Sequence, residues 1–221
     1  MTASAPSPLH VVLLGPPASG KGTQGRRLAE SLGLAYLSTG ALLREQVESG
    51  TALGKQAEPI LARGEYLPDE LMCPIIAEWL ARQSGGWMLD GYPRSLPQAG
   101  FLTAWLADRG RKLDAAILLE VPFAELLQRM QDRVECPQCR WSGQRRELAV
   151  GDLCPACAHP TERRADDSEA NFRSRHDEFT AMTLPVADYY RVSGILVTCD
   201  ATAPRDEVTA RLLSLIAVPK P

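Results

Sequence analysis

The sequence contains no apolar run long enough to cross a membrane. A membrane-spanning helix needs about 18 or more consecutive apolar residues, and no run among the 221 residues approaches that length. The first eight residues also lack the basic start and the long apolar segment of a signal peptide. We therefore expect a short disordered tail at 1–8, a folded region at 9–221, no membrane partner and a cytoplasmic location.

An excess of basic residues is also absent. The chain has 24 Lys and Arg against 27 Asp and Glu, which gives a formal net charge of -3 at pH 7. Proteins that bind nucleic acid over a broad surface usually show a clear basic excess. The charge balance therefore argues against a nucleic-acid partner and implies that the arginines act locally.

A glycine-rich segment follows the first apolar run. Val11–Leu14 leads into Gly15-Pro16-Pro17-Ala18-Ser19-Gly20-Lys21-Gly22-Thr23, which fits the pattern G-x-x-x-x-G-K with a hydroxyl residue close behind. A strand that ends in such a loop directs backbone N–H groups and the start of the next helix at one small volume, where a polyphosphate is stabilised. Lys21 would add a mobile positive charge to the outer phosphates. A glycine-rich surface turn is the alternative, but the strand, the spacing and the lysine all favour a phosphate-binding loop.

Short apolar runs alternate with helical patterns along the chain. The runs fall at 9–14, 35–37, 87–89, 115–121 and 195–199. This alternation predicts the α/β class, with a P-loop three-layer fold in which helices cover a five-stranded parallel sheet. Two segments do not fit the alternation, 38–67 and 134–163, and we expect both to be insertions at strand ends, where α/β proteins bind ligands.

The helical patterns are clearest in the second half of the chain. Apolar residues at spacings of three or four predict a helix that follows Pro122 and extends to Val134. A second helix should begin near Asp166 and kink at Pro185, because proline cannot continue the hydrogen-bond pattern. A last helix should cover 208–216.

Four of the six cysteines form two pairs with metal-ligand spacing. Cys136, Cys139, Cys154 and Cys157 give C-x2-C-x14-C-x2-C, which is typical of a tetrahedral zinc ribbon. Four thiolates leave no open position for water, so the metal should be structural. The alternative is four unrelated thiols, and we interpret the nearby His159 as an ordinary surface histidine.

Four motifs in order along the chain resemble the adenylate kinase family in its long-lid, zinc-bearing bacterial form. They are Gly15–Gln24, Ser38-Thr39-Gly40 with Arg44, Asp90-Gly91-Tyr92-Pro93-Arg94, and Arg164-Ala165-Asp166-Asp167. The resemblance implies a monomer with three parts: a core that carries the phosphate loop, an AMP-binding insertion at 38–67 and a zinc-binding lid at 134–170. It also implies Mg2+-dependent phosphoryl transfer from ATP to AMP, which gives two ADP.

The resemblance assigns roles to individual residues. The ATP site would comprise Gly15, Ala18, Ser19, Gly20, Lys21, Gly22, Thr23, Arg129, Arg133 and Ala203. The AMP site would comprise Thr39, Gly40, Arg44, Glu65, Tyr66, Leu67, Gly91, Arg94, Gln98, Arg164 and Arg175. The catalytic set would be Lys21, Arg94, Arg129, Arg133, Arg164 and Arg175, with Asp90 acting through water on Mg2+. In this reading Gln98 recognises adenine and the four cysteines bind Zn2+.

The sequence departs from the family pattern at several positions. Ala18 replaces a common glycine in the phosphate loop, where it is tolerated only if the backbone φ is negative. Arg140 and Ala158 replace glycines that usually follow the cysteine pairs. Gly143 replaces a tyrosine near the ATP adenine, for which Trp141 would substitute. Asp200-Ala201 replaces a common Asp-Gly beside the same base.

The sequence is also compatible with other functions. A UMP/CMP kinase or a kinase that uses GTP shares most of the motifs. A zinc-ribbon binding module with a nucleotide switch, or a catalytically silent relative, would share fewer. The long metal-bearing segment and Gln98 favour adenylate as the acceptor.

Overall fold

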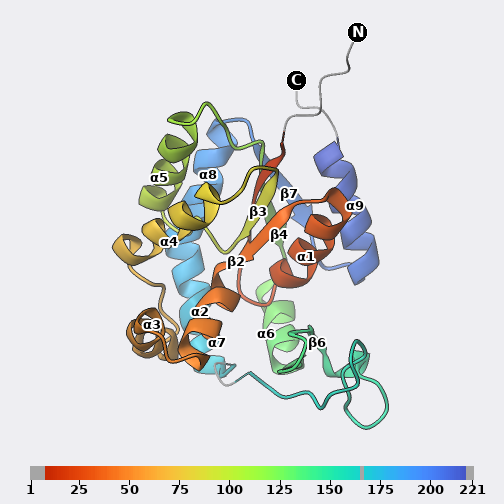
Figure 1. Cartoon of the computed structure of the whole chain (residues 1–221). Helices are drawn as coiled ribbons and strands as arrows, with labels where there is room; N and C mark the ends of the chain where they lie inside the picture. Colours follow the sequence, from red (N-terminus) through yellow and green to blue (C-terminus); the bar gives the residue numbers. More distant parts are fainter. Residues whose placement is uncertain (1–7, 165–166, 218–221) are drawn as a thin grey trace.

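A computed structural model describes residues 8–164 and 167–217 of the chain. Its central sheet is parallel and has the strand order β2-β3-β1-β4-β7, which confirms the predicted five-stranded parallel sheet. The strands lie in the middle layer with helices on both sides (Figure 1). Their bounds are β1 (His10–Leu14), β2 (Ala35–Ser38), β3 (Trp87–Asp90), β4 (Ala115–Glu120) and β7 (Leu196–Asp200).

Alternate residues of β1 face two separate apolar clusters, one on each side of the sheet. Val11 and Leu13 pack with α1 (Lys21–Leu32) and α9 (Arg205–Ala217). Val12 and Leu14 pack with α4 (Asp69–Ala81), α5 (Leu96–Ala107) and α8 (Leu184–Val192). Because both faces are covered, the strands read as continuous apolar runs, as expected for a parallel sheet.

The connections place the chemistry at one edge of the sheet. The chain leaves β1 through α1 on one face and leaves the neighbouring β3 through α5 on the other face. Adjacent strands whose connections go to opposite faces leave a crevice beyond their carboxyl ends. The glycine-rich loop and Asp90-Gly91 therefore meet in the same crevice.

The two irregular segments form insertions near this edge. The helical insertion (residues 38–67) contains α2 (Thr39–Glu48) and α3 (Ala52–Ala62). The two helices can pack closely because Gly54 has no side chain: a Cβ there would lie only 2.0 Å from the Gln46 carbonyl oxygen. The cysteine insertion (residues 134–170) carries the hairpin of β5 (Arg133–Glu135) and β6 (Ser142–Gln144) and projects away from the sheet (Figure 1).

One predicted helix end was wrong, and the next helix is described from its cap onward. The helix after Pro122 is α6 (Phe123–Gln131), and Val134 belongs to β5, where it pairs with Gly143. The following helix, α7, spans Glu169–Glu178 with the Ser168 side chain as its cap, whereas the predicted start at Asp166 lies outside the described residues. A π-helical turn at Phe179–Thr183 joins α7 to α8, so Pro185 lies at the start of a helix, where it is tolerated.

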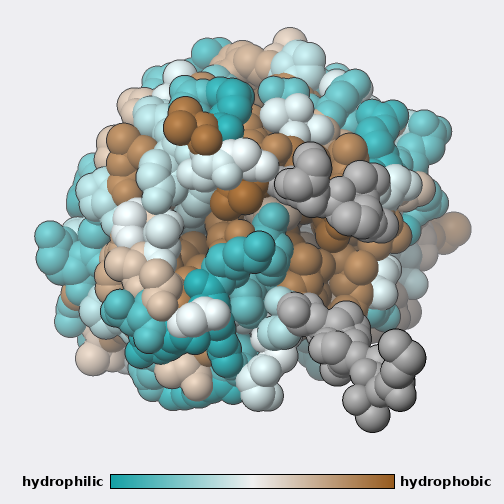
Figure 2. All heavy atoms as spheres, turned by 90° about the horizontal axis from the view of Figure 1, so that it is seen from above, coloured by the Kyte–Doolittle hydropathy of each residue, from teal (hydrophilic) through white to brown (hydrophobic). Residues whose placement is uncertain are grey.

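Figure 2 shows the end of the molecule away from the insertions, where polar and apolar residues are interspersed over the surface. Among the helices formed by residues 8–164 and 167–217, none combines the length and the apolar character that crossing a membrane requires. The carboxyl ends of β1 and β3, by contrast, lie on the side of the sheet that carries the two insertions.

Candidate active site

A cleft of about 1040 Å3 opens at the carboxyl ends of β1 and β3, with walls from the sheet loops and from both insertions. It contains most of the residues that the sequence predicts for a nucleotide site. Those that line it are Gly15, Ala18, Ser19, Gly20, Lys21, Gly22, Thr23, Gly40, Arg44, Glu65, Tyr66, Leu67, Asp90, Gly91, Arg94, Arg129, Arg133, Arg164, Arg175 and Ala203.

The glycine-rich loop has the backbone shape of an anion cradle. Gly20 has φ 93° and caps α1 without a side-chain hydrogen bond, so the first N–H groups of that helix point into the loop. The buried Ser19 hydroxyl has no hydrogen-bond partner among the described residues. Both features suit a bound phosphate, because an anion satisfies free donors at a helix start.

From the sequence, we expect alanine to be tolerated at position 18 only if its backbone φ is negative. Ala18 instead adopts φ 62°, a left-handed conformation. A left-handed conformation costs a non-glycine residue roughly 1 to 2 kcal/mol. The Ala18 methyl group packs against a cluster of Leu126, Met130 and Phe172, which offsets part of that cost. Ala18 therefore packs the glycine-rich loop against α6 and α7.

Lys21 points into the loop. Its Nζ donates hydrogen bonds to the Gly15 carbonyl oxygen at 2.6 Å and to the Pro16 carbonyl oxygen at 2.8 Å. Burial and, to a smaller extent, repulsion from nearby arginines lower its pKa to about 8, against the opposing effect of Asp90. A cation whose pKa is depressed by burial and by other cations is stabilised by a bound polyanion.

Two arginines, Arg133 at the start of β5 and Arg164 in the cysteine insertion, are held by carboxylates. Arg133 forms a two-pronged ion pair with Asp167, in which Nε lies 2.7 Å from Oδ2. Arg164 Nε lies 2.5 Å from Glu135 Oε2. Burial and repulsion from Arg133 and Arg44 lower the pKa of Arg164 to about 10, so the group stays charged at neutral pH. Anchoring of this kind keeps like charges close together and oriented.

Arg94 and Arg129 are positioned from the core. Arg94 donates from Nε to the Gly91 carbonyl oxygen at 2.7 Å, and its guanidinium lies 4.1 Å from the centre of the Tyr66 ring. Arg129 donates to the Ala201 carbonyl oxygen at 2.8 Å. Arg129 also forms an ion pair with Glu125, so each guanidinium is held by at least two contacts and keeps other N–H donors for a ligand.

Asp90 ends β3 and is 5% exposed. The Tyr36 hydroxyl donates to its Oδ2 at 2.8 Å, and burial together with Asp90 raises the Tyr36 pKa. The carboxylate faces the phosphate loop, since a Cβ at Gly22 would lie 3.7 Å from Oδ2. An acidic oxygen beside a phosphate cradle suits a hydrated hard cation.

Thr39 and Gln98 lie at the edge of the cleft and are not among the described residues that line it. Thr39 Oγ1 donates to the carbonyl oxygens of Asp90 and Gly91 at 3.2 and 3.0 Å. Gln98 is 2% exposed and lines a smaller cavity of about 310 Å3, which shares Tyr66 with the main cleft. Both side chains, which are predicted to contact AMP, are therefore fixed at the edge of the cleft by hydrogen bonds to other residues of the chain.

The sequence reasoning missed some charged residues of the cleft. Arg146, Arg163 and Arg205 also line it, and Arg205 Nη2 lies 2.6 Å from Glu147 Oε2 of the cysteine insertion. No local pattern separates them from ordinary surface charges, because the chain segments that bring them together are far apart in sequence.

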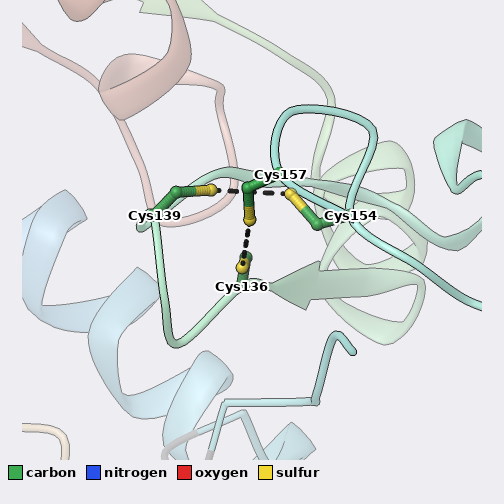
Figure 3. A group of neighbouring side chains, drawn as sticks. All are labelled: Cys136, Cys139, Cys154 and Cys157. Atoms are coloured by element: carbon green, nitrogen blue, oxygen red, sulfur yellow. Dashed lines mark hydrogen bonds between the residues drawn. The ribbon is translucent and has the colours of Figure 1, made fainter. Parts of the chain in front are cut away.

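The four predicted metal ligands converge on one point (Figure 3). The sulfur atoms of Cys136, Cys139, Cys154 and Cys157 all lie within 4.8 Å of one another. Sulfur atoms bound to one tetrahedral zinc at about 2.3 Å would lie roughly 3.8 Å apart, so the cluster fits such an ion. The cluster is compatible with a zinc-bearing insertion.

The two cysteine turns have matching backbones. The Arg140 N–H donates to the Cys136 carbonyl oxygen, and the Ala158 N–H donates to the Cys154 carbonyl oxygen in the same way. Arg140 and Ala158 have φ 61° and 55°, so each occupies a position that favours glycine. His159 is exposed, as expected.

The prediction that Trp141 substitutes near the ATP adenine does not match the arrangement. A Cβ at Gly143 would lie 2.4 Å from the Trp141 ring, so the ring covers Gly143. Gly143 lines the cleft, but Trp141 is not among the described residues that do.

Comparison with known proteins agrees with this geometry. A sequence model described as adenylate kinase matches residues 13–195. Similar proteins named adenylate kinase include one from Moorella thermoacetica, 40% identical over 88% of this chain and 91% of its own length. Others are from Novosphingobium aromaticivorans, 39% identical over 95% and 99%, and from Methanocella arvoryzae, 38% identical over 94% and 98%. The chain therefore belongs to the adenylate kinase family.

Proposed function

We propose that the protein transfers the terminal phosphoryl group of ATP to AMP, giving two ADP, in the cleft at the carboxyl ends of β1 and β3. The observation that carries the proposal is the convergence of Lys21, Arg94, Arg133 and Arg175, whose repulsion contributes to the lowered pKa of Lys21. Phosphoryl transfer depends on charge neutralisation and in-line positioning more than on covalent catalysis. The comparisons favour neither another nucleoside monophosphate kinase nor a binding module.

The donor would lie on the glycine-rich loop. Backbone N–H groups of residues 18–23 and the Lys21 ammonium would hold its β- and γ-phosphates, with Arg129 and Arg133 on the transferring group. Its adenine would lie beside Ala203, which lines the cleft near the Arg129–Ala201 contact.

The acceptor would lie between β3 and the helical insertion, which we propose as the AMP-binding part. Arg44 and Arg94 would bind the AMP phosphate, and Arg164 and Arg175 would join them around the group in transfer. Gln98 would recognise the base at the edge of the cleft. The remaining predicted members are Thr39, Gly40, Gly91 and the backbone of residues 65–67.

Mg2+ would accompany ATP, where it neutralises phosphate charge. Asp90 fits the role of a ligand acting through water, because its carboxylate is buried beside the phosphate loop. We further propose that the four cysteines hold a structural Zn2+ and that the cysteine insertion acts as the lid. We also propose that the protein is a monomer and that it works in the cytoplasm, where a reducing environment keeps the thiols reduced.

A coupled assay tests the function directly. The purified protein is given ATP and Mg2+ with AMP, GMP, CMP or UMP in turn, and kcat/KM is measured for each acceptor. We expect AMP to be preferred by about tenfold or more, because a wrong base leaves polar groups unpaired at about 1 to 3 kcal/mol per group. Equal use of UMP or CMP would instead make it a pyrimidine monophosphate kinase.

A further inference from the structure

The Gln98 amide is held by two contacts of opposite character. Its Oε1 accepts a hydrogen bond from the Arg94 backbone N–H at 2.8 Å. Its Nε2 donates to Asp69 Oδ1 at 2.6 Å. Asp69 belongs to the first turn of α4, and its other oxygen accepts from the Ser95 hydroxyl at 3.0 Å. The Asp69 carboxylate therefore uses both oxygens on the turn that presents Gln98.

These contacts allow only one orientation of the amide. An ionised carboxylate can only accept and a backbone N–H can only donate. Rotating the amide by half a turn would place its oxygen against Asp69 and its NH2 group against the Arg94 N–H, so both contacts would become repulsive. Because Gln98 is 2% exposed, water cannot compensate for the lost bonds.

The fixed orientation decides which base the amide can recognise. After its two protein contacts, the amide keeps one N–H donor and one oxygen lone pair. Adenine offers a ring nitrogen that accepts beside an amino group that donates, which complements that pair. Hypoxanthine has the same shape but offers the reverse, a ring N–H beside a carbonyl oxygen. An amide free to rotate would suit either base.

We propose that Asp69 is a positioning residue for acceptor selectivity, which fixes the Gln98 amide in the orientation that matches adenine and rejects 6-oxo purines. The inference rests on the proposed function, in which Gln98 recognises the AMP base. Asp69 itself acts only through Gln98.

Asp69 could also stabilise α4 directly, and the variants must distinguish that structural role from the positioning of Gln98. A carboxylate in the first turn of a helix is stabilised by the helix dipole, typically by 0.3 to about 1 kcal/mol. Asp69→Asn removes the negative charge but keeps an oxygen that can accept from Gln98 Nε2. Asp69→Leu removes both the charge and the acceptor. Glu70→Gln, at the exposed neighbouring position in the same turn, is the matched control for charge alone.

The experiment measures kcat and KM for AMP and IMP, with ATP as donor, in the wild type and the three variants. We expect Asp69→Leu to raise the KM for AMP and to reduce the AMP-to-IMP ratio of kcat/KM by about tenfold or more, the loss expected for one or two buried hydrogen bonds. The KM for ATP should change little. Asp69→Asn and Glu70→Gln should keep the wild-type ratio within about threefold, which is less than one buried hydrogen bond is worth.

Three results would overturn the inference. Asp69→Leu could keep the wild-type ratio, or Asp69→Asn could lose it as fully as the leucine variant does, which would assign the effect to helix charge. If the leucine variant does not fold, as judged by circular dichroism, Asp69→Ala is measured in its place, and failure of both to fold would make Asp69 a folding residue. A wild type that does not use AMP at all would instead refute the proposed function.

Discussion

At the scale of single residues, we expect the charge of Lys21 to control phosphate binding by the glycine-rich loop. Its pKa is lowered to about 8 when no nucleotide is bound, chiefly by burial. A bound polyphosphate favours the charged form, so the pKa of the complex must be higher than that of the free protein. Above pH 8, binding must therefore include the uptake of a proton.

We predict that ATP affinity falls as the pH rises above about 8, by up to about tenfold per unit until the pKa of the complex is reached. Titration calorimetry between pH 7.5 and 9.5, in buffers with different ionisation enthalpies, would measure both the affinity and the proton uptake. ATP itself adds no slope there, because its terminal phosphate, with a pKa of about 6, is already ionised. Lys21→Gln should bind ATP weakly and without this pH dependence. A flat profile for the wild type would contradict the assignment of Lys21.

The residue scale also shows what local sequence can and cannot predict. The phosphate loop was predictable because its glycines and Lys21 act within nine residues of one another. The contact between Asp69 and Gln98 was not predictable, because it spans 29 residues and depends on how α4 meets α5. Ala18 shows a third case, in which a conformation normally given to glycine is held by tertiary packing.

At the scale of elements, the strands were predictable and the ends of the helices less so. Buried parallel strands are continuous apolar runs, which a sequence displays directly. The apolar spacing after Pro122 continues to Val134, but the helix ends at Gln131. Val134 is buried in a hairpin with Gly143 instead. Burial of Val134 is thus compatible with either a helix or a strand. Only its pairing with Gly143, which the sequence does not reveal, shows that it lies in a strand.

The cysteine insertion has little apolar material to hold it together. Among its described residues, 134–164 and 167–170, the buried apolar side chains are Val134, Cys136 and Cys154. A segment of this kind needs a metal or disulfides for stability, because its chain entropy exceeds what so small a core offsets. We therefore expect the thiol cluster, with a bound metal, to be the main support of this insertion.

We predict about one Zn2+ per chain, measured by elemental analysis of the reduced protein. Removal with a chelator should unfold the cysteine insertion while the sheet core persists, because metal binding and folding of the insertion are coupled. Limited proteolysis should then cut within 140–153, and the far-ultraviolet helical signal should remain.

Two cysteine variants sharpen this test. Cys136→Ser should lose the metal and become protease-sensitive, whereas Cys73→Ser, outside the insertion, should keep both the metal and the resistance of the wild type. If the reduced protein contains no metal, or its metal-free form resists protease equally, the structural role fails.

At the scale of the whole molecule, the two insertions touch across the cleft. Arg140, in the first cysteine turn, forms a two-pronged ion pair with Glu48 at the end of α2, in which Nη1 lies 3.0 Å from Oε1. The Arg140 carbonyl oxygen accepts from Arg26 Nη1 of α1 at 3.1 Å. Three parts of the molecule therefore meet at a residue whose backbone conformation favours glycine.

We predict that this contact stabilises the closed cleft. Arg140→Gln and Glu48→Gln should each increase the nucleotide-free distance between labels on the two insertions, for example at the exposed Val150 and Lys55, attached without use of thiols. Both ion-pair side chains are about half exposed, at 49% and 50%. The pair should therefore contribute only about 0.2 to 1 kcal/mol, a shift of roughly 1.4- to 5-fold in the closed population.

A double-mutant cycle distinguishes the interaction between Arg140 and Glu48 from the individual effect of each substitution. The variant Arg140→Gln/Glu48→Gln should open the cleft no more than either single variant, and the difference from the wild type should shrink in high salt, which screens exposed charges. Glu78→Gln removes a comparable exposed pair with Arg82 at the end of α4 and should leave the label distance unchanged. Strictly additive single effects, or an equal response to Glu78→Gln, would show that net charge controls the opening. Coupling confined to Arg140 and Glu48 would show instead that the arginine holds the two insertions together, even though its position in the cysteine turn favours glycine.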